Sequence, residues 1–293
     1  MKNHNIAFIA NSQDKRQILR RLTRRINVKP ARIFVPQHPG ETPEHHFPQQ
    51  AVYRIQNPGP RFVNRYDSKE ILMVVGDSAL KSGREDASAG CSFIYKGGAA
   101  ATAAFAGLSV LGQANVPVAF ATTTFPYMND GSCRDVGGII AFRLEDKGPG
   151  GAAMDPTSNR AKMRAVIAAL EFRAWADEGW RSIVIATDLE YVVRGATEWL
   201  PRWVQNRWKK RPGGGGGRVA NRDLWEELQG IIDRLRESGT DVAFWYIRPR
   251  ILSLQGSALA HDAQEAARKA AYREPDICAE EFTRFCEIDL GLW

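Results

Sequence analysis

Three aspartates stand where acidic side chains could gather into one cluster. Asp77 lies near the end of an apolar, β-branched run (residues 71–79), Asp188 follows a second such run (183–187), and Asp262 lies near the start of an Ala-rich segment. Carboxylate oxygens are the ligands that hard divalent cations such as Mg²⁺ prefer. Between the first two aspartates lies Lys162, whose charge has the opposite sign. We therefore ask whether this lysine joins the acidic cluster or faces away from it.

The elements that must position these residues follow from hydrophobic periodicity. Short apolar or alternating runs predict strands, and apolar residues at helical spacing predict helices. Three strands come first, followed by a helix, a strand, a short helix and a long helix, a strand and a last helix. This order predicts an α/β protein with a mixed five-stranded sheet covered by helices. The predicted strands are residues 71–79, 89–96, 137–146, 183–187 and 240–249, and the main helices start near residues 157, 221 and 261.

The helix that carries Lys162 begins after Thr157 or Ser158, either of which can cap it. Its buried stripe includes Met163, and Lys162 lies about 100° from that residue around the helix. The lysine is thus at the edge of the stripe. It can lean over the sheet or turn to water.

Several segments resemble ribonuclease H of type 1, especially its fungal branch. They are VVGDSAL, TSNRAKMRAVIAAL, IATDLEYVVRGATEWLPRWVQNRWKKR, NRDLWEEL, FWYIRPR and HDAQEAARKAA, and they span roughly residues 70–272. The resemblance implies the ribonuclease H-like fold. It also implies endonucleolytic hydrolysis of the RNA strand of RNA/DNA hybrids.

In that family four acidic residues hold two divalent metals, Mg²⁺ or Mn²⁺, which activate water and stabilise the leaving oxygen. The matching positions here are Asp77, Lys162, Asp188 and Asp262. The first, third and fourth would be the catalytic, metal-binding acids, while Lys162 replaces the family's glutamate. Two outcomes stay open: Lys162 turns away and activity is weakened, or it displaces the metals and leaves an inactive nucleic-acid-binding or scaffold domain.

Asp130, in the stretch NDGSC, is a rival for the first acid because its surroundings are closer to the family's strand end. Only one predicted strand separates it from the helix at 157, however, whereas the family fold needs two. Asp77 has both strands after it. We therefore favour Asp77.

The resemblance also implies where nucleic acid would bind. Thr157 and Asn159 match a polar pair that approaches the minor groove of the hybrid, where 2′-hydroxyl groups distinguish RNA. A basic, tryptophan-rich segment resembles the family's handle for the phosphates of the DNA strand. Alternatively, its tryptophans are core residues and its cations are simply solvated. The handle residues are Trp199, Trp203, Trp208, Lys209, Lys210 and Arg211.

Three departures weaken the match near the acids. Leu189 follows Asp188 where the family usually has serine, and the stretch RPRILSLQGSALAHD lacks the family's pattern after the fifth strand. His261 is a weak candidate for a role in product release. The register of Asp262 with the family's last acid therefore stays open.

Composition and charge agree with a nucleic-acid partner. The chain has 293 residues, a formal net charge of +7 and a sequence pI of about 9.3, which favours a polyanion. We expect a basic N-terminal extension and Pro-rich linker (1–68), in which His45 and His46 belong to a polar loop. A ribonuclease H-like domain (69–275) with an insertion at about 97–136 should follow, and then a C-terminal tail (276–293).

Compartment and other partners are less constrained. The four scattered cysteines have no zinc-site spacing, no signal peptide is apparent, and the longest apolar stretch is too polar for a membrane span. We expect an intracellular protein. The basic N-terminus suits a nuclear or nucleic-acid-binding arm, a mitochondrial transit segment or a solvated helix, and otherwise the protein would be cytoplasmic. No protein partner is indicated.

Overall fold

The computed structural model describes residues 28–52, 59–81, 84, 86–97, 133–135, 138–211, 216–248, 257–272 and 281–285. The chain divides into two compact units, which we treat separately. The larger, the sheet unit, comprises Ala31–Thr197 and Asn221–Trp293, and the smaller comprises Met1–Pro30 and Glu198–Ala220. In the described part of the chain, no helix has the length and apolar character needed to cross a bilayer.

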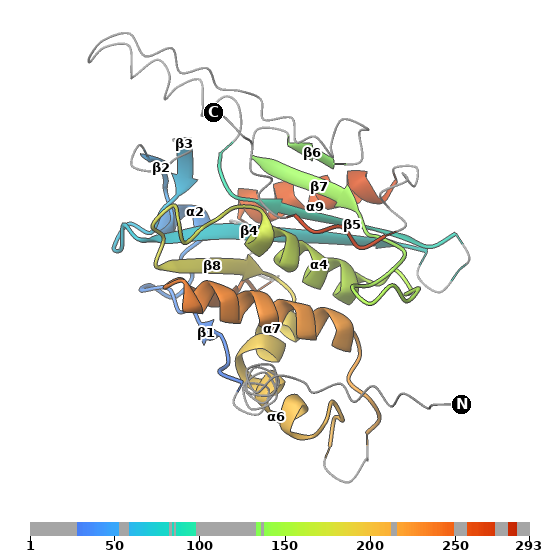
Figure 1. Cartoon of the computed structure of the whole chain (residues 1–293). Helices are drawn as coiled ribbons and strands as arrows, with labels where there is room; N and C mark the ends of the chain where they lie inside the picture. Colours follow the sequence, from blue (N-terminus) through green and yellow to red (C-terminus); the bar gives the residue numbers. More distant parts are fainter. Residues whose placement is uncertain are drawn as a thin grey trace, which may run out of the picture. The chain divides into compact units, whose positions relative to one another are not determined.

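The sheet unit is built on the five predicted strands (Figure 1). β4 is central, with β5 and then β7 antiparallel on one side and β8 and then β9 parallel on the other. The bounds are β4 (Glu70–Leu80), β5 (Ser88–Ile94), β7 (Ile139–Arg143), β8 (Ser182–Thr187) and β9 (Asp241–Tyr246). The sequence-based prediction of these strands and of a mixed sheet is confirmed.

The number of strands in the sheet is larger than predicted. β1 (Arg32–Ile33) pairs parallel with β9, and β6 (Cys133–Asp135) pairs antiparallel with β7, which makes seven strands. Both added strands lie at edges, and they are two and three residues long. Such short segments carry no readable alternation, so hydrophobic periodicity could not reveal them.

Helices cover both faces of the sheet (Figure 1). α4 (Ser158–Glu171) packs on β4 and β5 and against α7 (Arg222–Glu237). α9 (Ala258–Ala271) packs on β4, β5 and β7. Successive side chains of a strand point to opposite faces, so Gly76 meets α9 while Asp77 points toward α4.

α9 approaches the sheet very closely at glycines. A Cβ atom added to Gly76 would lie 2.4 Å from backbone atoms of Ala263, and one added to Gly90 would lie 2.0 Å from the carbonyl oxygen of Ala267. Ser92 Oγ donates a hydrogen bond to the Ala263 carbonyl at 2.6 Å. Small residues on both elements therefore fix the position of α9 against the two strands.

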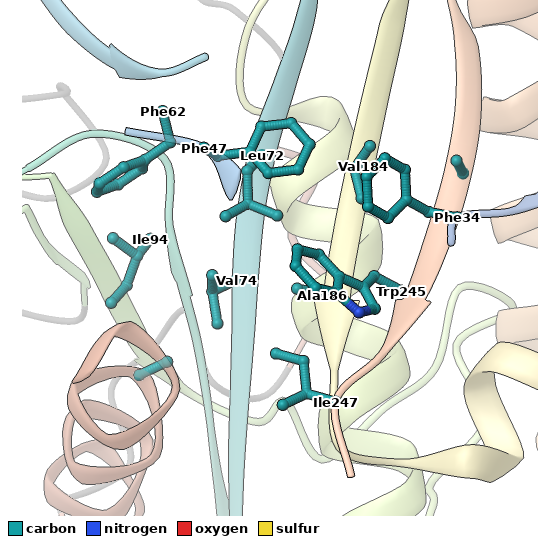
Figure 2. Packing of buried hydrophobic residues seen from close by; sticks show 12 residues of the cluster. Phe34, Phe47, Phe62, Leu72, Val74, Ile94, Val184, Ala186, Trp245 and Ile247 are labelled. Carbon is teal, nitrogen blue, oxygen red and sulfur yellow. The ribbon is translucent and has the colours of Figure 1, made fainter. Parts of the chain in front are cut away.

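The core on the α9 face includes aromatic residues from the N-terminal region (Figure 2). Phe34, Phe47 and Phe62 are buried with Leu72 of β4 and Trp245 of β9. The second half of the expected basic extension and Pro-rich linker (1–68) contains α2 (Pro43–His46) and the hairpin of β2 (Gln49–Val52) and β3 (Gly59–Phe62). That expectation was wrong.

Two local features explain why the Pro-rich segment could not be recognised as packed structure from its sequence. A proline at the first position of a helix costs nothing, because its missing N–H would be unpaired there anyway, and Pro43 begins α2. The buried phenylalanines are too irregularly spaced to give a period. The Pro-rich composition therefore hid a packed segment, and the sheet unit begins at Ala31 rather than at residue 69.

His45 and His46 also differ from the expected polar loop. His46 is 2% exposed and packs edge-on against Phe34. The carboxylate of Glu41 lies 3.0 Å from His45 Nδ1 and 2.7 Å from His46 Nδ1. This contact holds α2 to the preceding chain. Most of the expected insertion at 97–136 lies outside the described residues.

Candidate functional site

β4 and β8 bring Asp77 and Asp188 to the same edge of the sheet. The two strands are parallel, with Val74 beside Ala186, and each aspartate follows within three residues of that pair. Carboxyl ends of neighbouring parallel strands lie together. The structure therefore brings the first and third predicted acids into one cluster.

Lys162 of α4 reaches directly into this cluster. Its Nζ lies 2.8 Å from Asp77 Oδ1 and 2.7 Å from Asp188 Oδ1, and it donates to the carbonyl oxygen of Val75 at 3.3 Å. The side chain is 1% exposed. An ammonium group has three N–H donors, and here each has an acceptor. Lys162 thus leans over the sheet.

The surroundings of the two carboxylates are unequal. Asp77, with 9% of its side chain exposed, also accepts a hydrogen bond from the Ser158 hydroxyl through Oδ2. Its backbone carbonyl accepts from Gln264 Nε2 of α9 at 2.6 Å. Asp188 keeps 34% of its side chain exposed. One carboxylate is therefore enclosed by donors, while the other still faces solvent.

This arrangement does not fit a divalent metal. A metal bound between Asp77 and Asp188 would compete for the carboxylate oxygens that the Lys162 ammonium already contacts. In the part of the chain that the structure describes, no group of three or more His, Cys, Asp or Glu side chains could hold a metal ion. Asp262 lies exposed on α9.

A cavity of about 430 Å³ opens beside Asp188. Val75 and Thr187 line it from the strand ends, and His261 and Gln264 line it from α9. From the sequence, Ser158 was expected only as a helix cap, and Gln264 was not expected at the site. The only sequence signal for their presence here is proximity, because Ser158 is next to Thr157 and Gln264 is two positions after Asp262.

The start of α4 presents the polar pair that was matched to minor-groove contacts. Thr157 caps the helix, its Oγ1 accepting from the Arg160 N–H at 3.3 Å, and both Thr157 and Asn159 are exposed. Arg160 forms a two-pronged ion pair with Asp223 at the start of α7, with distances of 2.6 and 3.1 Å. The exposed pair is thus carried by an anchored helix end.

The smaller unit contains the tryptophan-rich basic segment. Within α6 (Leu200–Gln205), Trp203 is buried, and its ring lies 5.6 Å from that of Trp199. The Trp208 N–H donates to the Trp203 carbonyl at 2.6 Å. By contrast Lys209, Lys210 and Arg211 are exposed. The tryptophans thus pack while the cations face solvent, and a role of this segment in gripping phosphates stays a prediction.

A family model described as RNase H matches residues 124–246. This range includes Asp130 and begins after Asp77. Asp130 lies outside the described residues, whereas Asp77 stands on the central strand next to Lys162 and Asp188. The matched range therefore does not include Asp77, and its assignment to the family's first acid stays a prediction.

Comparison with curated proteins gives relatives of the same kind. A ribonuclease H from Cyanothece sp. is 36% identical over 152 residues, covering 52% of this chain and 79% of that protein. A ribonuclease H from Xanthomonas oryzae pv. oryzae is 37% identical over 113 residues, covering 36% of this chain and 71% of that protein. Among solved structures, the PFV RNase H domain in solution matches at 16% identity and a TM-score of 0.40, covering 69% of this chain and 93% of that one. On the strength of the curated relatives, this chain belongs to the ribonuclease H family.

Proposed function

We propose that this protein binds RNA/DNA hybrids through its ribonuclease H fold and has lost metal-dependent cleavage. The observation that carries the proposal is the Lys162 ammonium, buried between Asp77 and Asp188. The sequence resemblance implied two-metal hydrolysis with Mg²⁺ or Mn²⁺ held by Asp77, Asp188 and Asp262. The lysine supplies a cation at the place where a metal would be needed.

Electrostatics favour the lysine over a metal. Two unit charges about 4 Å apart interact by roughly 4 kcal/mol at an effective dielectric constant of 20. A divalent ion beside the ammonium would be repelled by about twice that amount, before screening. The ammonium also removes the repulsion between the two carboxylates, which is costly in a partly buried cluster without a counter-ion.

Binding does not depend on the acids. Thr157 and Asn159 are exposed at an anchored helix end and suit contacts to 2′-hydroxyl groups in the minor groove. The exposed cations Lys209, Lys210 and Arg211 suit phosphate contacts, which dominate affinity for nucleic acids. Hybrid binding therefore survives the loss of the metals.

The test compares the natural protein with Lys162→Glu, using a labelled RNA/DNA hybrid with millimolar Mg²⁺, Mn²⁺ or chelator. The natural protein should bind the hybrid equally well in all three, leave it uncut and keep the same thermal midpoint. Lys162→Glu should gain thermal stability with Mg²⁺ because three carboxylates then face one another. Lys269→Glu, an exposed lysine on α9, is the matched control and should show no such gain.

Two results would overturn the proposal in different ways. Metal-dependent cutting by the natural protein would mean that Lys162 leaves the cluster and the chain is a working, altered ribonuclease H. Failure to bind the hybrid at low salt would remove nucleic acid as the partner.

A further inference from the structure

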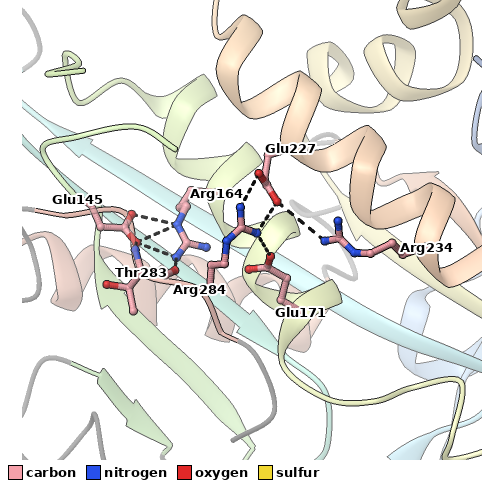
Figure 3. Close-up of polar contacts among 7 residues, drawn as sticks. All are labelled: Glu145, Arg164, Glu171, Glu227, Arg234, Thr283 and Arg284. Atoms are coloured by element: carbon pink, nitrogen blue, oxygen red, sulfur yellow. Dashed lines mark hydrogen bonds and ion pairs between the residues drawn. The ribbon is translucent and has the colours of Figure 1, made fainter. Parts of the chain in front are cut away.

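Residues Glu281–Phe285, which we term the tail segment, pack on a surface formed by α4, α7 and the β7 region. Figure 3 shows their polar contacts. The contacts reach Glu145 after β7, Arg164 and Glu171 of α4, and Glu227 of α7. We term this the tail-docking surface. None of these residues contacts the acidic cluster at Asp77.

Arg164 is the centre of the tail-docking surface. Its side chain is fully buried, and its Nε and Nη2 atoms donate to the Glu145 carboxylate at 2.7 to 3.0 Å. Nη2 also donates to the backbone carbonyl of Thr283, whose own N–H donates to Glu145 at 3.3 Å. The tail backbone thus adds one hydrogen bond to each member of a buried ion pair, where a lost partner would be costly.

Aromatic rings enclose the same guanidinium group. Its central carbon lies 4.5 Å from the ring centre of Phe282 and 5.0 Å from that of Phe285. Phe142 of β7 lies 5.1 Å from it and 4.7 Å from the Phe285 ring. Cations over aromatic faces are attracted by the ring quadrupole, more strongly when desolvated. Both tail phenylalanines therefore have a specific receptor.

Arg284 provides the third anchor and joins two helices. The two terminal nitrogens of its guanidinium group donate to Glu227 of α7 at 2.6 and 2.9 Å, and one of them also donates to Glu171 of α4 at 3.0 Å. The Glu171 side chain is only 5% exposed, and burial raises the pKa of its carboxyl group. A forked pair fixes geometry as well as charge. The arginine accordingly supplies a cation where two carboxylates converge.

The tail segment is supplied by a nearby part of the same chain. α9 ends at Ala271 on the other face of the sheet, and eight residues (273–280) separate Tyr272 from Glu281. A linker of that length gives an effective concentration in the millimolar range, so weak contacts suffice for docking.

We propose that the tail-docking surface is a binding site for a short linear segment of the type Phe-Thr-Arg-Phe, and that its occupant is this chain's own residues Phe282–Phe285. Recognition rests on two rings around Arg164 and one forked arginine between Glu171 and Glu227. The docked segment ties α4 to α7 and the β7 region. It thereby braces the helix that carries Lys162, two residues from Arg164.

The test releases the tail in the full chain with Phe282→Ser/Arg284→Glu and offers a fluorescent peptide of residues 280–285. The released variant should bind the peptide at least about tenfold more tightly than the natural chain, whose site is already filled. Its thermal midpoint should fall by roughly 3 to 8 °C. Adding Glu227→Gln to the released variant should weaken peptide binding about tenfold.

Controls make the result specific. A peptide carrying the Arg284→Glu change should not bind, and Arg268→Glu, at an exposed arginine of α9, should not increase peptide binding by the full chain. If the released variant fails to fold, trypsin cleavage after Arg284 should still be faster in Glu227→Gln than in the natural chain. Equal peptide binding by natural and released chains, or equal trypsin rates, would overturn the proposal. A natural protein that is dimeric by light scattering and exchanges its tails would assign the occupant to a second copy instead.

Discussion

At the scale of single residues, Lys162 decides the character of the site. Its ammonium group is completely buried and has an acceptor for each N–H, two of them carboxylates. Removing one partner of a buried charge group leaves uncompensated charge and costs several kcal/mol. The lysine is therefore a structural necessity for this version of the cluster.

Lys162→Met should lower the free energy of unfolding by about 3 to 5 kcal/mol, because Asp77 and Asp188 then repel each other without a cation. Urea unfolding at neutral pH measures this change. Adding Asp188→Asn should recover part of the loss by removing one charge. Lys269→Met, at a lysine with 68% of its side chain exposed, should change stability by less than about 0.5 kcal/mol. An equally small effect at Lys162 would show that the ammonium group is not needed there.

The sequence singled out Lys162 as a candidate site residue but could not show the direction in which its side chain points. Lys162 lies at the edge of an apolar stripe, where a long side chain can reach either the sheet or water. Its actual direction follows from tertiary contacts with β4 and β8. That Asp77 and Asp188 lie close together could be expected, because the sequence predicts each of them near the carboxyl end of a strand. Their counterpart Asp262 stays a prediction, as does the likeness to the fungal branch.

At the scale of elements, the close approach of α9 to β4 holds one side of the site in place. Gly76 is next to Asp77, and Gln264 of α9 donates to the Asp77 carbonyl. A shift of α9 would therefore be transmitted to the backbone of the acidic cluster.

Gly76→Ala should destabilise the protein by about 1 to 3 kcal/mol, the usual cost of overpacking. Its Cβ would lie 2.4 Å from backbone atoms of Ala263, which cannot move aside as a flexible side chain could. Thermal unfolding measures the effect. Gly230→Ala in α7 is the matched control, since its Cβ meets only the Arg234 side chain at 3.5 Å and alanine favours a helix by about 0.5 to 1 kcal/mol. Equal changes in both variants would contradict the close-packing argument.

A second prediction at this scale concerns acid. Burial raises the pKa of the Glu41 carboxyl, but hydrogen bonds and charges from His46 and His45 outweigh burial and leave the pKa below the usual 4.5. A lowered pKa in the folded state contributes stability that is present above 4.5 and lost as the pH falls through the lowered value. Glu41→Gln should therefore cost stability near neutral pH. The difference from the natural chain should shrink below 4.5, as urea unfolding across this range would show. A difference independent of pH would argue against the ion pair.

The sequence predicted the elements that have a clear period and missed those that do not. The five long strands, α4, α7 and α9 were visible as repeating apolar positions. Residues 31–64 were not, because their buried phenylalanines follow no helical or strand spacing. The tail segment was missed for the same reason, since its contacts are made by single side chains at a sequence distance of more than 50 residues.

At the scale of the whole molecule, a net charge of +7 provides a general attraction to polyanions. Contacts of individual cations with phosphates should be measurable from the way hybrid affinity falls as the salt concentration rises. The Lys209→Gln/Lys210→Gln/Arg211→Gln variant should weaken hybrid binding and reduce the slope of log affinity against log salt by roughly 1 per lost contact. Fluorescence anisotropy at several salt concentrations tests this. A triple change at exposed residues outside this segment, Arg222→Gln/Arg268→Gln/Lys269→Gln, gives the same charge loss. If both variants lose the same slope, the effect is one of net charge and not of these contacts.

The pairing of β1 with β9 has a consequence for how the protein is made. Arg32 and Ile33 lie beside Ala243 and Phe244, so the contact closes a loop of about 210 residues. Such contacts form late, because the entropy of closing the loop must be overcome first. During synthesis, β1 emerges long before its partner strand exists. β1 should therefore wait unpaired, exposed to chaperones and proteases, until β9 has left the ribosome.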